Sequence, residues 1–143
     1  MEGVTFRKAR MGDSSAIARL VTQLGYPTTP PEMEERLKRL LSHPEYTTIV
    51  AEASDHVVGL VGAYLRHALE FDSTYGRLTG LVVDEGWRRR GLGRALMDHI
   101  EAWLRQHGAS SVTLTSGKHR AAAHRFYEAI GYDATGVRFG KPL

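Results

Sequence analysis

The sequence contains no cysteine, which excludes disulfides, thiolate metal ligands and cysteine nucleophiles. It also lacks a long apolar run, because stretches such as VVGLVGAYL are far shorter than the roughly 20 residues of a membrane span. The N-terminal MEGVTFRKARMGD does not resemble a signal peptide. The charge is nearly balanced, with 19 basic and 16 acidic residues, so an anionic ligand is permitted without nucleic acid being required. These absences predict a cytoplasmic chain without a membrane partner.

The 143 residues suit one domain, spanning residues 1–143, of an α/β class. Alternating or β-branched apolar patterns predict strands at 4–9, 47–53, 57–66, 75–83 and 111–115, and a last strand near Tyr132 and 137–139. Apolar residues at helical spacing predict helices from about Asp13, from Pro30, from Leu92 to about Gly108, and over 121–130. This order of elements is typical of an α/β sandwich with a mixed sheet.

The arginine- and glycine-rich segment Arg88-Arg89-Arg90-Gly91-Leu92-Gly93-Arg94 lies between a predicted strand and the best predicted helix. The first N–H groups of a helix have no partner within the helix, and the helix dipole places partial positive charge there. Glycines at 91 and 93 let a ligand approach these donors, so the segment predicts a phosphate or pyrophosphate site. A solvated arginine face or a nucleic-acid contact is the alternative. The segment is not a Walker loop, because no Gly-Lys-Ser/Thr ends it. It also lacks the full Gly-x-Gly-x-x-Gly dinucleotide fingerprint, since position 96 is Leu.

Two motifs together resemble the GNAT superfamily of acyl-CoA-dependent N-acetyltransferases. The first is Arg88-x-x-Gly91-x-Gly93, which matches the acyl-CoA signature of that family. The second is AAAHRFYEAIGY, in which Ala123, Phe126-Tyr127-Glu128 and Gly131-Tyr132 occupy the positions of family residues. The resemblance covers the whole chain. It implies a mixed central sheet of about six to seven strands flanked by about four helices, and transfer of an acetyl group from acetyl-CoA to an amine.

The resemblance also implies which residues hold the cosubstrate. Backbone amides of the turn bind the coenzyme A pyrophosphate in the family, which implicates residues 88–94. Backbone groups of the preceding strand pair with the pantetheine arm, which implicates Leu81, Val82 and Val83, although a buried strand explains them as well. The strand before the last helix splays from its neighbour in the family. This points to its end at Thr115-Ser116 and makes Ser116 a further candidate.

Two side chains near the second motif receive roles from the same resemblance. Tyr127 matches the tyrosine that protonates the departing coenzyme A thiolate, although packing with His124 and Ile130 explains it too. A phenol with a pKa near ~10 can give a proton to a thiolate whose acid has a pKa near ~8.5. Relatives often carry asparagine where this chain has Arg120, which either reaches coenzyme A phosphates or lies on the surface.

No carboxylate lies within the strand 75–83, where some relatives have a glutamate as general base. Glu70, Asp72 and His67 are candidates, as are Asp84 and Glu85, and water is an equal contender. Acidic residues favour a cationic acceptor amine: Glu32, Glu34, Glu35, Glu70 and Asp72. His119 and His124 show no metal-ligand pattern, so no metal is expected.

These residues predict a small-molecule amine as the acceptor. A protein amine, a non-catalytic acyl-CoA-binding module and a nucleic-acid-binding domain are the alternatives. Nucleic acid is the weakest of them, because the remaining basic residues are dispersed and no aromatic platform interleaves with them. A homodimer is common in the family and is possible here.

Overall fold

One sheet of five strands organises residues 1–113, as a computed structural model describing residues 1–143 shows. The strands are β1 (Val4–Lys8), β2 (Tyr46–Ala53), β3 (His56–Arg66), β4 (Thr74–Val83) and β5 (Ala109–Thr113), in that spatial order. The pairs from β1 to β4 are antiparallel, and β5 is parallel to β4. The sheet is therefore mixed, as the sequence predicted.

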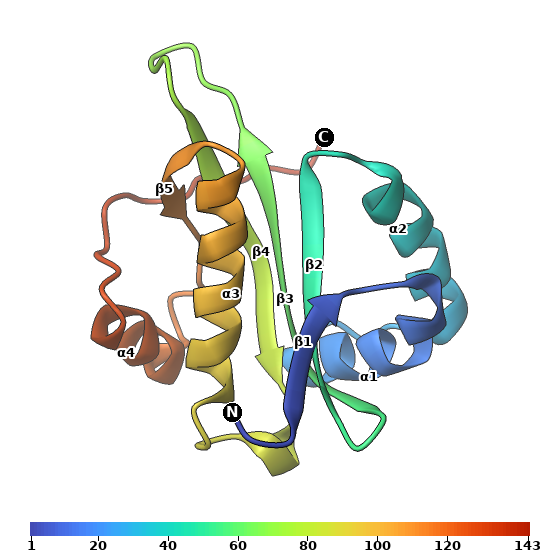
Figure 1. Cartoon of the computed structure of the whole chain (residues 1–143). Helices are drawn as coiled ribbons and strands as arrows, with labels where there is room; N and C mark the ends of the chain where they lie inside the picture. The colour runs from blue at the N-terminus through green and yellow to red at the C-terminus, as the bar shows by residue number, and fades with distance from the viewer. The chain divides into compact units, whose positions relative to one another are not determined.

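Helices cover both faces of this sheet (Figure 1). The helices α1 (Ser14–Leu24) and α2 (Pro30–Ser42) lie on one face, and α3 (Leu92–Gln106) lies on the other. Thr29 and Glu32 form a capping box at the start of α2. Helix α1 ends at Gly25, which is in the left-handed region (φ 118°). Apolar residues of α1 and α2 pack with those of the sheet, namely Ile17, Ala18, Leu20, Met33 and Leu37 with Val50, Val57, Leu60 and Val82. No helix is long and apolar enough to cross a membrane.

The chain divides into a compact unit of Met1–Thr113 and a smaller one of Leu114–Leu143. The smaller unit contains α4 (Ala121–Ala129) and no strand. The prediction of a last strand was therefore wrong, and the sheet has five strands in place of six to seven. Val137 and Phe139 are 73% and 92% exposed, and glycines at 136 and 140 bound a run of only three residues. Such a run has too few apolar side chains to bury a strand face.

The strand predicted at 111–115 begins and ends two residues earlier, at Ala109–Thr113. Gly108 is in the left-handed region (φ 87°), so the chain turns at once from α3 into β5. Thr115 and Ser116 consequently follow the strand and do not end it.

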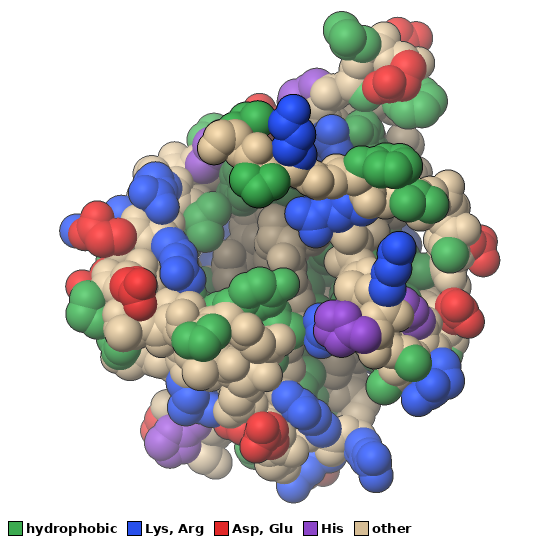
Figure 2. All heavy atoms as spheres, turned by 180° about the vertical axis from the view of Figure 1, so that it is seen from behind, with side chains coloured by type: hydrophobic (Ala, Val, Ile, Leu, Met, Phe, Trp, Pro, Cys, Tyr) green, Lys and Arg blue, Asp and Glu red, His purple; other side chains and the backbone are tan.

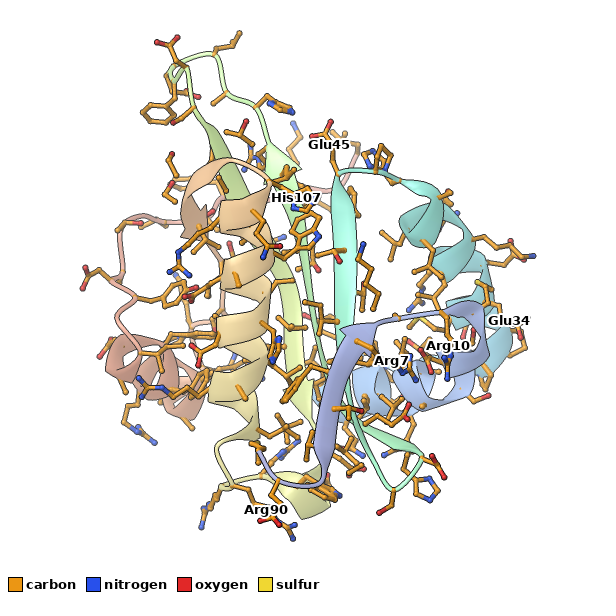
Figure 3. All side chains as sticks on the ribbon, in the orientation of Figure 1. Arg7, Arg10, Glu34, Glu45, Arg90 and His107 are labelled. Atoms are coloured by element: carbon orange, nitrogen blue, oxygen red, sulfur yellow. The ribbon has the colours of Figure 1, made fainter.

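An ion-pair network joins the start of α1 to the edge of the sheet. The Arg7 guanidinium donates to both carboxylate oxygens of Asp13 at 2.9 Å and to Glu52 Oε2 at 2.6 Å. The backbone N–H of Arg10 donates to Asp13 Oδ2 at 2.9 Å, and Figure 3 shows Arg7 and Arg10 at the end of β1, where both approach α1. Burial alone would raise the pKa of Asp13, but these hydrogen bonds outweigh it and the pKa is lowered.

We expect Arg7→Met to destabilise the fold by about 3 kcal/mol near pH 7, because it leaves the Asp13 carboxylate buried without its partner. The folded pKa of Asp13 is lowered, so its contribution is complete above the unfolded value of about 4 and is lost as pH falls below it. The difference between parent and variant should therefore shrink below pH 4. Urea unfolding from pH 7 to pH 3 measures this, with Lys8→Met as the neighbouring exposed control. A difference independent of pH would contradict the network's role.

Candidate active site

The second half of β4 has a free edge. β5 pairs with β4 only from Thr74 to Arg77, whereas β3 pairs with β4 from Tyr75 to Val83. In residues 78–83, backbone groups that point away from β3 therefore have no partner strand. Leu81 and Val83 are half-buried and Val82 is buried. An extended ligand arm can pair with such an edge as an added strand, which fits the predicted role of residues 81–83.

A turn with unpaired backbone donors follows directly. β4 leads through Asp84 and a short 3-10 helix, η2 (Glu85–Trp87), into the turn before α3. None of the N–H groups of residues 88–94 donates to a backbone carbonyl. Arg89 (φ 63°) and Gly91 (φ 81°) are in the left-handed region, a backbone conformation that occurs in anion-binding turns. With the positive end of α3 behind it, this turn suits a pyrophosphate.

The arginines of the turn divide into two pairs. Arg88 Nε donates to the carbonyl of Val83 at 3.0 Å, and the Arg90 guanidinium lies over the Trp87 ring at 4.6 Å. Figure 3 shows Arg90 at the turn that precedes α3. Arg89 and Arg94 are exposed and form no ion pair within the chain. The first pair fixes the turn, and the second carries positive charge that no group of the chain neutralises.

Helix α1 holds this turn through contacts that the sequence analysis did not foresee. Arg19 donates to Asp84 Oδ2 at 2.7 Å, and Gln23 donates to Asp84 Oδ1 at 3.4 Å. The side-chain Oε1 of Gln23 also accepts from the backbone N–H of Glu85 at 3.2 Å. Burial alone would raise the pKa of Asp84, but the hydrogen bonds of Arg19 and Gln23 lower it. Asp84 is therefore a structural anchor and a poor general base.

A β-bulge in β4 was also missed. The pairing passes from Gly62–Gly80 to Ala63–Leu78, which leaves Thr79 as an extra residue. A Cβ atom at Gly62 would lie 2.5 Å from Thr79 Oγ1, so glycine at 62 gives Thr79 its room. The bulge interrupts the ladder next to the free edge of β4. A one-residue register shift leaves no local sequence signal beyond the glycines at 62 and 80.

Three of the candidate bases lie in one exposed loop between β3 and β4. His67 Nε2 is 2.8 Å from Glu45 Oε2, whereas Glu70 and Asp72 are exposed without an ion-pair partner. Figure 2 shows acidic and hydrophobic side chains at the tip of this hairpin, upper right, where Leu69 and Phe71 are exposed. The loop gathers these candidates but buries none of them, so it singles out no base.

The acidic residues of α2 are partly used within the helix. Glu32 belongs to the Thr29 cap, and Glu35 Oε1 accepts from Lys38 at 2.8 Å. Glu34, labelled in Figure 3, is exposed and unpaired. Of the three carboxylates of α2 that the sequence analysis named, Glu34 is therefore the one left without an intrahelical partner to attract a cationic acceptor.

The remaining predicted site residues, in and just before the second motif, lie in the smaller unit. The Ser116 hydroxyl is buried and has no hydrogen-bond partner. Arg120 precedes the first residue of α4, and Tyr127 is half-buried on that helix. The Tyr127 ring lies against the rings of Phe126 (5.4 Å between centroids) and Tyr132 (5.9 Å). Burial raises the pKa of Tyr127, and the charge of Arg120 partly offsets this. No group of three or more potential metal ligands occurs in the protein.

Comparisons with known proteins bear on the family of this chain. An acetyltransferase (GNAT) family model matches residues 15–132. An aminoglycoside N(6')-acetyltransferase type 1 from Stenotrophomonas maltophilia is 32% identical over 97% of this chain and 94% of its own length. An aminoalkylphosphonate N-acetyltransferase from Salmonella typhimurium is 32% identical over 66% of this chain and 61% of its own. A solved aminoglycoside N-acetyltransferase in complex with CoA shares the fold, with a TM-score of 0.86, 16% identity, and coverage of 98% of this chain and 94% of that one. The chain belongs to the GNAT family of acetyltransferases.

Proposed function

We propose that the protein transfers the acetyl group of acetyl-CoA to a primary amine of a small molecule, by direct attack in a ternary complex. The observation that carries this proposal is the free edge of β4 leading into unpaired N–H groups at residues 88–94. These two features suit an arm ending in a pyrophosphate. Two relatives named for small amine substrates, an aminoglycoside and an aminoalkylphosphonate, support the acceptor class. We also propose that the protein is cytoplasmic and forms a homodimer. Sedimentation equilibrium tests the dimer.

The proposed reaction begins with a neutral amine, since an ammonium ion has no lone pair. Its nitrogen attacks the thioester carbonyl, and backbone N–H groups near Leu81 to Val83 stabilise the oxyanion that forms. Collapse of this adduct breaks the C–S bond and releases a thiolate. Tyr127, through its match to the family motif, gives the thiolate its proton. The products are an amide and free thiol, and holding both reactants together supplies much of the rate.

The proton lost by the amine goes to one of the remaining bases in this proposal. Asp84 is bound by Arg19 and Gln23, which leaves four side chains or water. The four are Glu70, Asp72, His67 and Glu85. His67 differs from the other three because Glu45 lies at hydrogen-bond distance from its ring. A carboxylate in that position orients an imidazole for proton transfer.

An acceptor screen read by thiol release tests the proposal. We expect turnover with at least one small primary amine among aminoglycosides, polyamines, aminoalkylphosphonates and amino acids. Acetyl-CoA at a hundredfold excess over its Kd should stabilise the fold by about 2.7 kcal/mol, which a melting curve records. Stabilisation without thiol release would indicate a non-catalytic acyl-CoA-binding module. Release only with lysine-containing peptides would indicate a protein acceptor, and an unmoved melting temperature would overturn the proposal.

A further inference from the structure

Arg120 is the N-cap residue of α4, and Tyr127 lies seven residues later on that helix. Seven residues correspond to almost two full helical turns, so the Cα atoms of the two residues lie on one stripe along the helix, about 10 Å apart. The backbone fixes Arg120 at the start of the helix, since its carbonyl accepts from the N–H of His124 at 3.1 Å. Ala123 lies between them on the same stripe and is small enough to leave room for a long side chain.

The Arg120 charge is available to act on its neighbours. Its side chain is exposed and forms no ion pair or hydrogen bond within the chain. The Tyr127 ring, in contrast, is half-buried between Phe126 and Tyr132, and its hydroxyl has no hydrogen-bond partner. A phenolate formed there would be poorly solvated and would depend on a nearby positive charge.

Two of the other ionisable groups of α4, Arg125 and Glu128, are placed differently around the helix. Arg125 lies about 160° from Tyr127 and Glu128 about 100°, while His124 lies one turn before Tyr127 on the same side. Arg120 is the one charged group that acts on the pKa of Tyr127, and it lowers that pKa against the effect of burial. A cation on the same side of the helix should lower the pKa of Tyr127, and the effect of Arg120 has this sign.

We infer that Arg120 is a positioning residue for Tyr127, stabilising the phenolate that forms when Tyr127 gives its proton to the departing coenzyme A thiolate. This inference rests on the proposed function, in which Tyr127 is the acid. The C–S bond breaks, its electron pair stays on sulfur, and sulfur takes the phenolic proton. The phenolate then regains a proton from solvent. Arg120 lowers the cost of this charge separation without touching the reacting atoms.

The experiment places 3-fluorotyrosine at position 127 of the full chain. Fluorine lowers the pKa of the phenol into a range where the protein stays folded, and it gives a single fluorine NMR signal to titrate. Arg120→Gln should raise the titration midpoint by about 0.3 to 1 pH unit, whereas Arg120→Lys should restore most of the shift. Arg125→Gln removes the same charge from the opposite side of the helix and should move the midpoint by less than half as much.

The titration needs neither substrate nor turnover, so its failure is distinct from failure of the proposed function. An equal shift in Arg120→Gln and Arg125→Gln, or none in either, would overturn the inference. With natural tyrosine at 127, Arg120→Gln should lower kcat severalfold and leave the KM for acetyl-CoA unchanged. A raised KM with an unmoved midpoint would instead place Arg120 on a coenzyme A phosphate and also overturn it. Melting curves of both glutamine variants establish that each is folded.

Discussion

Gly93→Val should weaken acetyl-CoA binding by roughly 10- to 150-fold while the protein stays folded. Gly93 lies in the first turn of α3, where the N–H groups have no partner within the chain. A branched side chain there would keep a phosphate from the backbone donors, and one hydrogen bond to a charged group contributes about 1.5 to 3 kcal/mol. Gly93 is a better position for this test than Gly91. Because Gly91 has a left-handed φ, any replacement there would be strained, and a loss of affinity could not be separated from a loss of stability.

Calorimetric titration with acetyl-CoA measures the effect, and Gly86→Val is the matched control. Gly86 lies in η2, has a φ outside the left-handed region and has open space where a Cβ would be. The same substitution therefore lies just before the turn. It should leave the affinity for acetyl-CoA within about twofold of the parent value. Unchanged affinity in a folded Gly93→Val variant would remove the pyrophosphate from this turn.

The sequence was most informative where a local pattern determines the backbone. Proline at 30 predicted the start of α2, where the structure adds the Thr29–Glu32 cap. The turn at 88–94 was found because arginine, glycine and a following amphipathic helix are adjacent in the chain. The last strand was predicted wrongly because Val137 and Phe139 have an apolar alternation but no partner strand to bury it.

Features that depend on distant residues were not accessible from the sequence. Arg19 and Asp84 are 65 residues apart, and only the fold shows that their ion pair ties α1 to the turn. The Thr79 bulge depends on the register between two strands, which a change of one residue would alter. Asp84 looked like a candidate base for the same reason, because its partner on α1 could not be identified from a local pattern.

Tyr127→Phe should lower kcat by roughly 10²-fold or more, the usual scale for loss of a general acid. The hydroxyl matters in the transition state, where the thiolate departs, and not in the bound ground state. The KM for acetyl-CoA should therefore change little. Phenylalanine keeps the ring that packs against Phe126 and Tyr132, so the fold should be preserved.

The matched control is Tyr132→Phe, which removes a phenol from the neighbouring ring of the same cluster. It should retain kcat within a few-fold, because its hydroxyl has no role in thiolate departure. The rates of both variants are compared across pH, and melting curves confirm that each is folded. Turnover by Tyr127→Phe at the parent rate at every pH would make Tyr127 a packing aromatic and leave water as the proton donor. A loss of activity in Tyr132→Phe as large as that in Tyr127→Phe would likewise show that the cluster, and not the Tyr127 proton, supports turnover.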